Sequence, residues 1–202
     1  EDNAALGLLL LLNALGQGEV YGLDGNPLVP LLRDATNCKE LLPVLYADPL
    51  LAPSAQLCDD GEYFSYTATS REGEELEVQV FYVCVGDASK PAITIMPDFP
   101  TSSIDYVELF DLLADEFYLC SIDYPGYGFS DKPRHFNYSV ADAGNLLDVF
   151  IRDVAQLSRT SLMSHGIGTS SVLELFLARQ SLPEPGYAIE HIFVLNSNLN
   201  RE

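Results

Sequence analysis

The sequence predicts an α/β protein with a mostly parallel sheet of about six strands and helices on both faces. Short continuous apolar runs, such as residues 92–96 and 117–122, are typical of strands that are buried on both faces. Longer segments with apolar residues at helical spacing, such as 140–157, alternate with these runs. Strands that alternate with helices of this length imply right-handed crossovers and a parallel sheet. With 202 residues, 48% of them hydrophobic, the chain can form one substantial core.

The elements of this domain follow one another from residue 59 onward. Two alternating segments come first and form a hairpin around residues 71–74. Buried strands and amphipathic helices then alternate to the end of the chain. In order, we expect strands at 64–70, 76–85 and 92–96, a helix at 103–116, a strand at 117–122, a helix at 140–157, a strand at 161–164, a helix at 169–180 and a strand at 189–195.

Residues 1–58 differ from the rest and are expected to form an irregular, partly helical N-terminal arm. Their Leu-rich patches are separated by Gly, Pro, Asn and Asp, and short helices are expected at 4–15 and 34–46. So much apolar surface without a clear core of its own predicts that the arm packs either on the main domain, 59–202, or on another subunit.

The composition is strongly acidic, with 30 acidic and 10 basic residues and a formal net charge of −20. Such a surface repels phosphate backbones and anionic lipid headgroups, so we expect no nucleic-acid partner. The longest apolar run, residues 4–15, is too short to cross a bilayer, so we expect no transmembrane segment within the sequence. The chain begins with Glu1 rather than Met, which together with the arm favours a processed subunit of an organellar or lumenal assembly.

The four cysteines contain no C-x-x-C pair, so neither a zinc site nor a thioredoxin-type motif is expected. The sequence predicts no other metal site and no cofactor. Cys84 and Cys120 lie in apolar strand patterns and are expected to behave as small buried hydrophobic residues. Cys38 and Cys58 flank a loop-like stretch and could be bridged in an oxidising compartment. The sequence leaves that pairing open.

Three blocks of sequence carry a resemblance to a known fold family. Residues 97–103 read Pro-Asp-Phe-Pro-Thr-Ser-Ser, residues 123–130 read Asp-Tyr-Pro-Gly-Tyr-Gly-Phe-Ser, and residues 164–168 read Ser-His-Gly-Ile-Gly between a strand and a helix. Together they resemble the haloalkane dehalogenase and epoxide hydrolase branch of the α/β-hydrolase fold, which has His-Gly-x-Pro-Thr-Ser-Ser, Asp-x-x-Gly-x-Gly-x-Ser and the nucleophile elbow at these places. The resemblance implies an incomplete α/β-hydrolase fold without a cap.

The resemblance places Gly166 at the position of the nucleophile, where the family has Asp, Ser or Cys. A glycine has no side chain that could attack a substrate. The resemblance also assigns an oxyanion hole to two backbone amides, and Asp98 adds a negative charge where the oxyanion would develop. We therefore expect no catalytic residue. The vestigial elbow and oxyanion region are expected to comprise Pro97, Asp98, Phe99, His165, Gly166, Ile167 and Gly168, with Phe99 and Ile167 supplying the two amides.

The rest of the family's catalytic apparatus is also expected to be missing. The family's catalytic His follows the last strand of an eight-stranded core, whereas this sequence stops just after the sixth strand. None of His135, His165 and His191 lies at the required place. Ser164 or Ser170 could in principle replace the nucleophile, but we expect the Ser164 hydroxyl to bond to the backbone instead.

These observations favour a non-catalytic structural or accessory subunit of a larger assembly. Its partners are expected to be other protein subunits that contact the arm 1–58 and the sheet edge near 189–195, since an uncovered edge strand invites pairing. Two alternatives stay open. The chain could be a hydrolase of esters, epoxides or haloalkanes that another chain completes, or a small-molecule binding module that kept the pocket without the chemistry.

Overall fold

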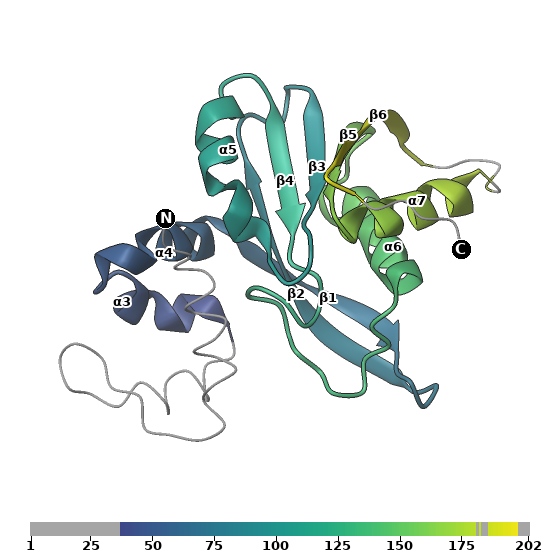
Figure 1. The fold of residues 1–202 in the computed structure, drawn as a ribbon, viewed down its shortest axis with the longest axis horizontal. Helices are drawn as coiled ribbons and strands as arrows, with labels where there is room; N and C mark the ends of the chain where they lie inside the picture. The colour runs from purple at the N-terminus through teal and green to yellow at the C-terminus, as the bar shows by residue number, and fades with distance from the viewer. Residues whose placement is uncertain (1–36, 181, 183–185, 198–202) are drawn as a thin grey trace. The chain divides into compact units, whose positions relative to one another are not determined.

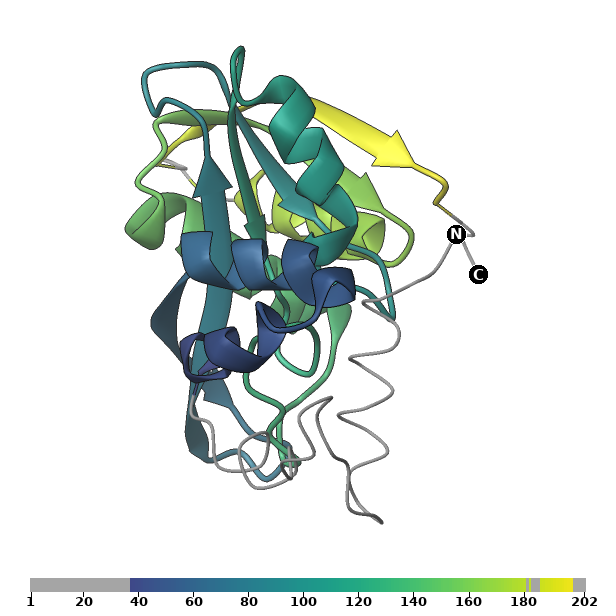
Figure 2. The same cartoon turned by 90° about the vertical axis from the view of Figure 1, so that its left-hand side faces the viewer.

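The computed structural model describes residues 37–180, 182 and 186–197, and the chain divides into two compact units, residues 1–60 and 61–202. The larger unit contains a six-stranded sheet in the order β1-β2-β4-β3-β5-β6 (Figures 1 and 2). Its strands are β1 (Glu62–Thr69), β2 (Glu75–Val85), β3 (Ala92–Met96), β4 (Tyr118–Ile122), β5 (Arg159–His165) and β6 (Ala188–Leu195). Each lies within a few residues of its predicted position.

The sheet is mostly parallel, as predicted. β3 pairs in parallel with both β4 and β5, and β5 pairs in parallel with β6. The hairpin of β1 and β2 is antiparallel, and β2 joins the parallel part through an antiparallel pairing with β4. β1 and β6 are therefore the two edges of the described sheet.

Helices cover both faces of this sheet. α5 (Val107–Leu113), which continues the 3-10 turn η3 (Ser103–Tyr106), lies on one side, and α6 (Val140–Val149) and α7 (Gly168–Arg179) lie on the other (Figure 1). Ser139 caps α6, because its hydroxyl accepts a hydrogen bond from the backbone N–H of Asp142 at 3.1 Å. The fold class expected from the sequence is confirmed.

The long helix expected at 140–157 changes its winding before it ends. After Val149 the chain forms the π-helical turn η4 (Phe150–Val154), and Ala155 N–H donates to the carbonyl of Phe150 at 2.8 Å. Gln156 then has a positive φ of 50°, which ends the helical path before the start of β5. The periodic apolar pattern alone did not reveal this early end.

The main core lies between the sheet and the pair α6 and α7. Phe150 is fully buried there, and its ring contacts the rings of Phe64 and Tyr82, at centroid distances of 6.0 and 5.4 Å. Burying large aromatic and aliphatic side chains of this kind is the dominant favourable contribution to folding. Fully buried members of this cluster include Val80, Cys120, Ile122, Leu146, Leu147, Ile151, Leu162 and Val172.

A buried arginine fastens α7 to the neighbouring elements. The guanidinium of Arg179 donates to Asp148 of α6 at 2.9 Å and to the carbonyl of Tyr187, just before β6, at 2.5 Å. Its Cζ atom also lies 3.5 Å from the centroid of the Tyr187 ring. Because Arg179 is 8% exposed, these partners compensate for burying its charge.

The expectation that Cys84 and Cys120 are merely small buried hydrophobic residues is wrong. The two residues face each other in the antiparallel pairing of β2 with β4, with Cα atoms 4.1 Å apart, and they form a disulfide. The close approach of directly opposite residues on antiparallel strands brings the two sulfur atoms together. An apolar strand pattern shows that a cysteine is buried, but it does not reveal which residue lies opposite.

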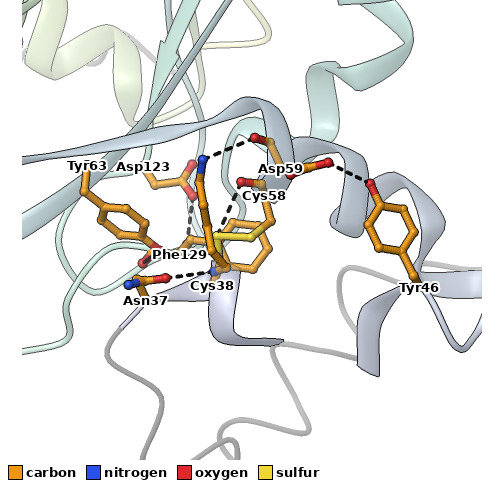
Figure 3. The surroundings of a disulfide bond; sticks show 9 residues. Asn37, Cys38, Tyr46, Cys58, Asp59, Tyr63, Asp123 and Phe129 are labelled. Carbon is orange, nitrogen blue, oxygen red and sulfur yellow. Dashed lines mark hydrogen bonds between the residues drawn. A yellow bond between two sulfur atoms is a disulfide. The ribbon is translucent and has the colours of Figure 1, made fainter. Parts of the chain in front are cut away.

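The smaller unit is described only from residue 37. It contains the 3-10 turn η1 (Cys38–Leu41), the single helical turn α3 (Leu42–Leu45), the 3-10 turn η2 (Pro49–Leu51) and the helix α4 (Ala52–Asp60). A disulfide between Cys38 and Cys58 joins η1 to α4, and the hydroxyl of Tyr46 donates to Asp59 at 3.3 Å (Figure 3). The pairing that the sequence left open is therefore present.

The expectations for this arm are met only in part. The helix predicted at 34–46 corresponds to η1 and α3, whereas α4 was not predicted. The helix predicted at 4–15 lies outside the described residues. The docking of the arm on the core or on a partner stays a prediction.

Candidate functional site

The third sequence block forms a sharp turn from strand to helix. β5 ends at His165, Gly166 has a φ of +51°, and α7 begins at Gly168. A β-carbon at residue 168 would lie 2.5 Å from the carbonyl oxygen of Pro97 and 2.6 Å from that of Met96, so only glycine lets the start of α7 approach the end of β3 this closely. The turn has the form of a nucleophile elbow.

A carboxylate lies beside this elbow, at the place where the resemblance to the family predicts an oxyanion hole. Oδ1 of Asp98 accepts hydrogen bonds from the backbone N–H of Phe99 and from that of Ile167, both at 2.8 Å. These are the two amides that the resemblance assigns to the hole. Their distances are typical of charge-assisted hydrogen bonds. The two donors are therefore already engaged by a negatively charged group of the chain itself.

The same carboxylate fills the space where a nucleophile would begin. A β-carbon at residue 166 would overlap Oδ1, Cγ and Oδ2 of Asp98. The positive φ of Gly166 adds a second reason for glycine, because other residues rarely adopt this conformation. The Asp98 carboxylate thus occupies the volume that a side chain at residue 166 would need, and glycine at 166 leaves that volume free.

The second sequence block forms a turn that is held by the buried carboxylate of Asp123. Asp123, fully buried after β4, accepts hydrogen bonds from Ser103 N–H at 2.8 Å and from the Ser103 hydroxyl at 2.7 Å. It also accepts one from Phe129 N–H at 2.8 Å (Figure 3). Burial raises the pKa of Asp123, and these hydrogen bonds oppose that effect. A β-carbon at Gly128 would overlap this carboxylate. The Asp-x-x-Gly-x-Gly-x-Ser pattern therefore forms a turn whose residues have a structural role.

A cavity of about 90 Å³ opens beside the elbow. Asp98 and Ile167 line one part of it, and aromatic residues line much of the rest. Of these aromatic residues, only Phe99 was predicted to belong to the site, and there for its backbone amide; the three tyrosines were not predicted, although the second block places two of them directly after β4. The aromatic residues that line the cavity are Phe99, Tyr124, Tyr127 and Tyr138.

Ser164, His135 and His191, three of the side chains that could replace the missing nucleophile or base, have other partners. Ser164 is fully buried, donates to the carbonyl of Phe193 at 3.3 Å and accepts from the Thr169 hydroxyl at 3.1 Å, so its expected bonding to the backbone is confirmed. His135 lies 3.2 Å from Glu72, and His191 lies 3.3 Å from the Ser161 hydroxyl.

None of the three histidines is among the described residues that line the cavity. In the part of the chain that the structure describes, no three His, Cys, Asp or Glu side chains are grouped so that they could hold a metal ion. No helix among those residues is long and apolar enough to cross a bilayer.

Known proteins share this arrangement of strands and helices. An α/β-hydrolase fold protein from Burkholderia ambifaria superposes with a TM-score of 0.56 at 22% identity, over 70% of this chain and 45% of that one. An ancestral haloalkane dehalogenase gives a TM-score of 0.51 at 22% identity, over 65% of this chain and 42% of that one. The chain has the α/β-hydrolase fold.

Sequence comparison also finds relatives of this chain. The mesoderm-specific transcript homolog protein of Bos taurus is 31% identical in an alignment of 147 positions that covers 65% of this chain and 41% of that protein. No family model matches the sequence. The chain spans about two fifths of the length of this relative.

The predicted site residues lie in two segments of the fold. Pro97, Asp98 and Phe99 follow β3, and the residues from His165 to Gly168 join β5 to α7. The structure brings the two segments together, because Ile167 N–H donates to Asp98. The sequence analysis placed the charge of Asp98 near the oxyanion hole but did not foresee that its carboxylate would occupy the hole. A side chain that bonds to the next residue's own amide leaves no pattern in a sequence.

Proposed function

We propose that this chain is a non-catalytic α/β-hydrolase-fold protein. The observation that carries the proposal is the position of Asp98. Oxyanion catalysis depends on amide donors that are free to bind the charge that develops in the transition state. Here Phe99 and Ile167 donate to a resident carboxylate, which would also repel a second negative charge. The absence of a side chain at Gly166 acts in the same direction, because no covalent intermediate can form at that residue.

Hydrolysis assays test this part of the proposal. The chain is incubated with small p-nitrophenyl esters, epoxides and haloalkanes, and both product formation and intact mass are followed. We expect no turnover above the rate in buffer and no covalent adduct. The Ser164→Ala variant is the matched control, because Ser164 is the hydroxyl nearest the elbow within β5. Turnover that is lost in this variant, or an adduct on Asp98 or on residues 164–170, would overturn the proposal.

We further propose that the chain serves as a structural or accessory subunit of a larger protein assembly. The support comes from β6, an edge strand of the described sheet, where three consecutive apolar side chains are each more than two fifths exposed. Phe193, Val194 and Leu195 are 44%, 44% and 43% exposed. Natural proteins usually cover or interrupt an apolar edge of this kind. A partner that adds a strand to β6 would bury these side chains.

Sizing of the purified chain tests the assembly. We expect self-association, or binding of a dye that fluoresces on exposed apolar surface, and we expect both to decrease in a Phe193→Lys variant. Phe176→Lys, on α7 and 37% exposed, is the control for an added charge at an exposed aromatic residue away from β6. A monomeric chain that does not bind the dye would refute this part.

The two disulfides support a proposal about the compartment. Disulfides persist in oxidising compartments and are rare where thiols are kept reduced. All four cysteines of the chain are paired, as Cys38 with Cys58 and Cys84 with Cys120. We expect the protein to fold in a lumenal or extracellular environment. Thiol titration of the denatured protein, isolated without reductant from its native source, should find no free thiol.

A further inference from the structure

The cavity beside the elbow has the size of a small functional group. Its volume is about 90 Å³. A group of a few non-hydrogen atoms, such as a methylated ammonium, fits this space. Four aromatic side chains and the carboxylate of Asp98 are among the residues that line it.

Several donors that an anion could use in this cavity are already occupied. The amides of Phe99 and Ile167 donate to Asp98. The hydroxyls of Tyr124 and Tyr138 donate to backbone carbonyls, at 3.1 and 2.8 Å. The hydroxyls of Thr101, Tyr127 and Ser171 also belong to residues that line the cavity. A carboxylate or phosphate ligand would nevertheless be repelled by the negative charge of Asp98, whereas a cation would be attracted.

The charge in the cavity is not neutralised. Within the described part of the chain, Oδ1 of Asp98 takes both amide hydrogen bonds, and no hydrogen bond or ion pair involves Oδ2. The described residues that line the cavity include no Lys, Arg or His. The formal charge of −20 adds a long-range attraction for cations.

The aromatic rings complete a site for a positive charge. The ring of Tyr127 lies 5.7 Å from that of Phe99 and 6.3 Å from that of Tyr124, measured between centroids. Aromatic faces attract cations electrostatically, and cages of such rings bind quaternary ammonium groups. Burial raises the pKa of Tyr124 and of Tyr127, so both phenols stay neutral well above physiological pH.

We propose that this cavity binds a small organic cation, an alkylated amine or quaternary ammonium group, between the carboxylate of Asp98 and the rings of Phe99, Tyr124 and Tyr127. The inference rests on the same Asp98 arrangement as the proposed lack of catalysis. Oδ1 of this carboxylate accepts the two amide hydrogen bonds, and Oδ2 has no hydrogen bond within the described part of the chain. Different measurements test the two proposals: turnover would overturn the lack of catalysis, whereas absence of equilibrium binding would overturn the cation site.

Three probes of similar shape and different charge test the proposal. Tetramethylammonium is the cation, tert-butanol the neutral analogue and pivalate the anion, each titrated into the full chain with ring-labelled tyrosine. We expect saturable shifts of tyrosine ring resonances with tetramethylammonium alone. Saturable shifts of equal affinity with tert-butanol, tighter binding of pivalate, or no binding of tetramethylammonium would each overturn the proposal.

Variants locate the binding. Asp98→Asn keeps an oxygen acceptor for the two amides but removes the charge, and it should weaken tetramethylammonium binding at least about tenfold, because charge attraction at a few ångströms is strong in a partly enclosed site. Asp105→Asn makes the same change in net charge at an exposed residue outside the cavity lining and should bind normally.

A second pair of variants tests the aromatic contribution independently. Tyr127→Leu removes the ring and should weaken binding about threefold or more, whereas Tyr127→Phe keeps the ring and should not. Melting temperatures show whether each variant is folded. Unchanged affinity in the folded variants Asp98→Asn and Tyr127→Leu would refute the proposal.

Discussion

Replacing Gly166 by alanine tests how closely Asp98 and Gly166 depend on each other. The new β-carbon would overlap the Asp98 carboxylate, which must then leave the amides of Phe99 and Ile167. A hydrogen bond to a charged group contributes about 1.5–3 kcal/mol, and we take about 1 kcal/mol each here, since Asp98 is only half-buried and water replaces part of the loss. The left-handed backbone adds about 1 kcal/mol for a residue with a side chain. Gly166→Ala should therefore lower the free energy of unfolding by about 3 kcal/mol.

A matched glycine separates the two costs. Gly73 has a φ of +83° and open space around its missing side chain, so Gly73→Ala should cost only the backbone term of about 1 kcal/mol. Asp98→Gly removes the obstacle, and in that background Gly166→Ala should again cost only about 1 kcal/mol. Urea unfolding followed by far-UV circular dichroism measures all of these values. The expected coupling between positions 98 and 166 is about 2 kcal/mol, and additive effects would refute the steric argument.

Two further predictions concern the disulfide in the sheet and a buried tyrosine. Replacing both Cys84 and Cys120 by alanine should lower the free energy of unfolding by about 3–4 kcal/mol, because the bond closes a loop of 36 residues, and urea unfolding that matches the oxidised wild type would contradict this. Burial, with the charges of Asp105 and Asp98, raises the pKa of Tyr106 to about 12, above the 10.0 of an unperturbed tyrosine. Its contribution to stability is therefore complete below pH 10.0 and is lost as the pH rises towards 12. Tyr106→Phe should flatten the fall in unfolding free energy over that window, and parallel curves for variant and wild type would contradict the assignment.

The sequence was sufficient for the sheet because its signals are local. Residues 92–96 are a continuous apolar run, and β3 has the same limits. Turns rich in glycine gave equally local signals: Gly166 and Gly128 were placed by motif, and both have positive φ in the structure. Where a helix changes its winding, as at Phe150–Val154, the apolar period continues and no local signal marks the change.

The parts that could not be predicted depend on residues far apart in the chain. Cys84 and Cys120 are 36 residues apart and meet only because β2 lies beside β4. Asp98 and Ile167 are 69 residues apart, and their hydrogen bond exists only because β3 and β5 are neighbours. The charge of Asp98 was visible in the sequence. The direction of its side chain, into the oxyanion hole, follows from the geometry of two turns that no spacing rule connects.

The overlap between positions 98 and 166 restricts the history of this site. The branch that the sequence resembles has glycine at the position of Asp98 and a nucleophile at the position of Gly166. A chain with side chains at both positions would place two groups in one volume. Any substitution path between the two arrangements that avoids this clash must therefore pass through a state with glycine at both positions.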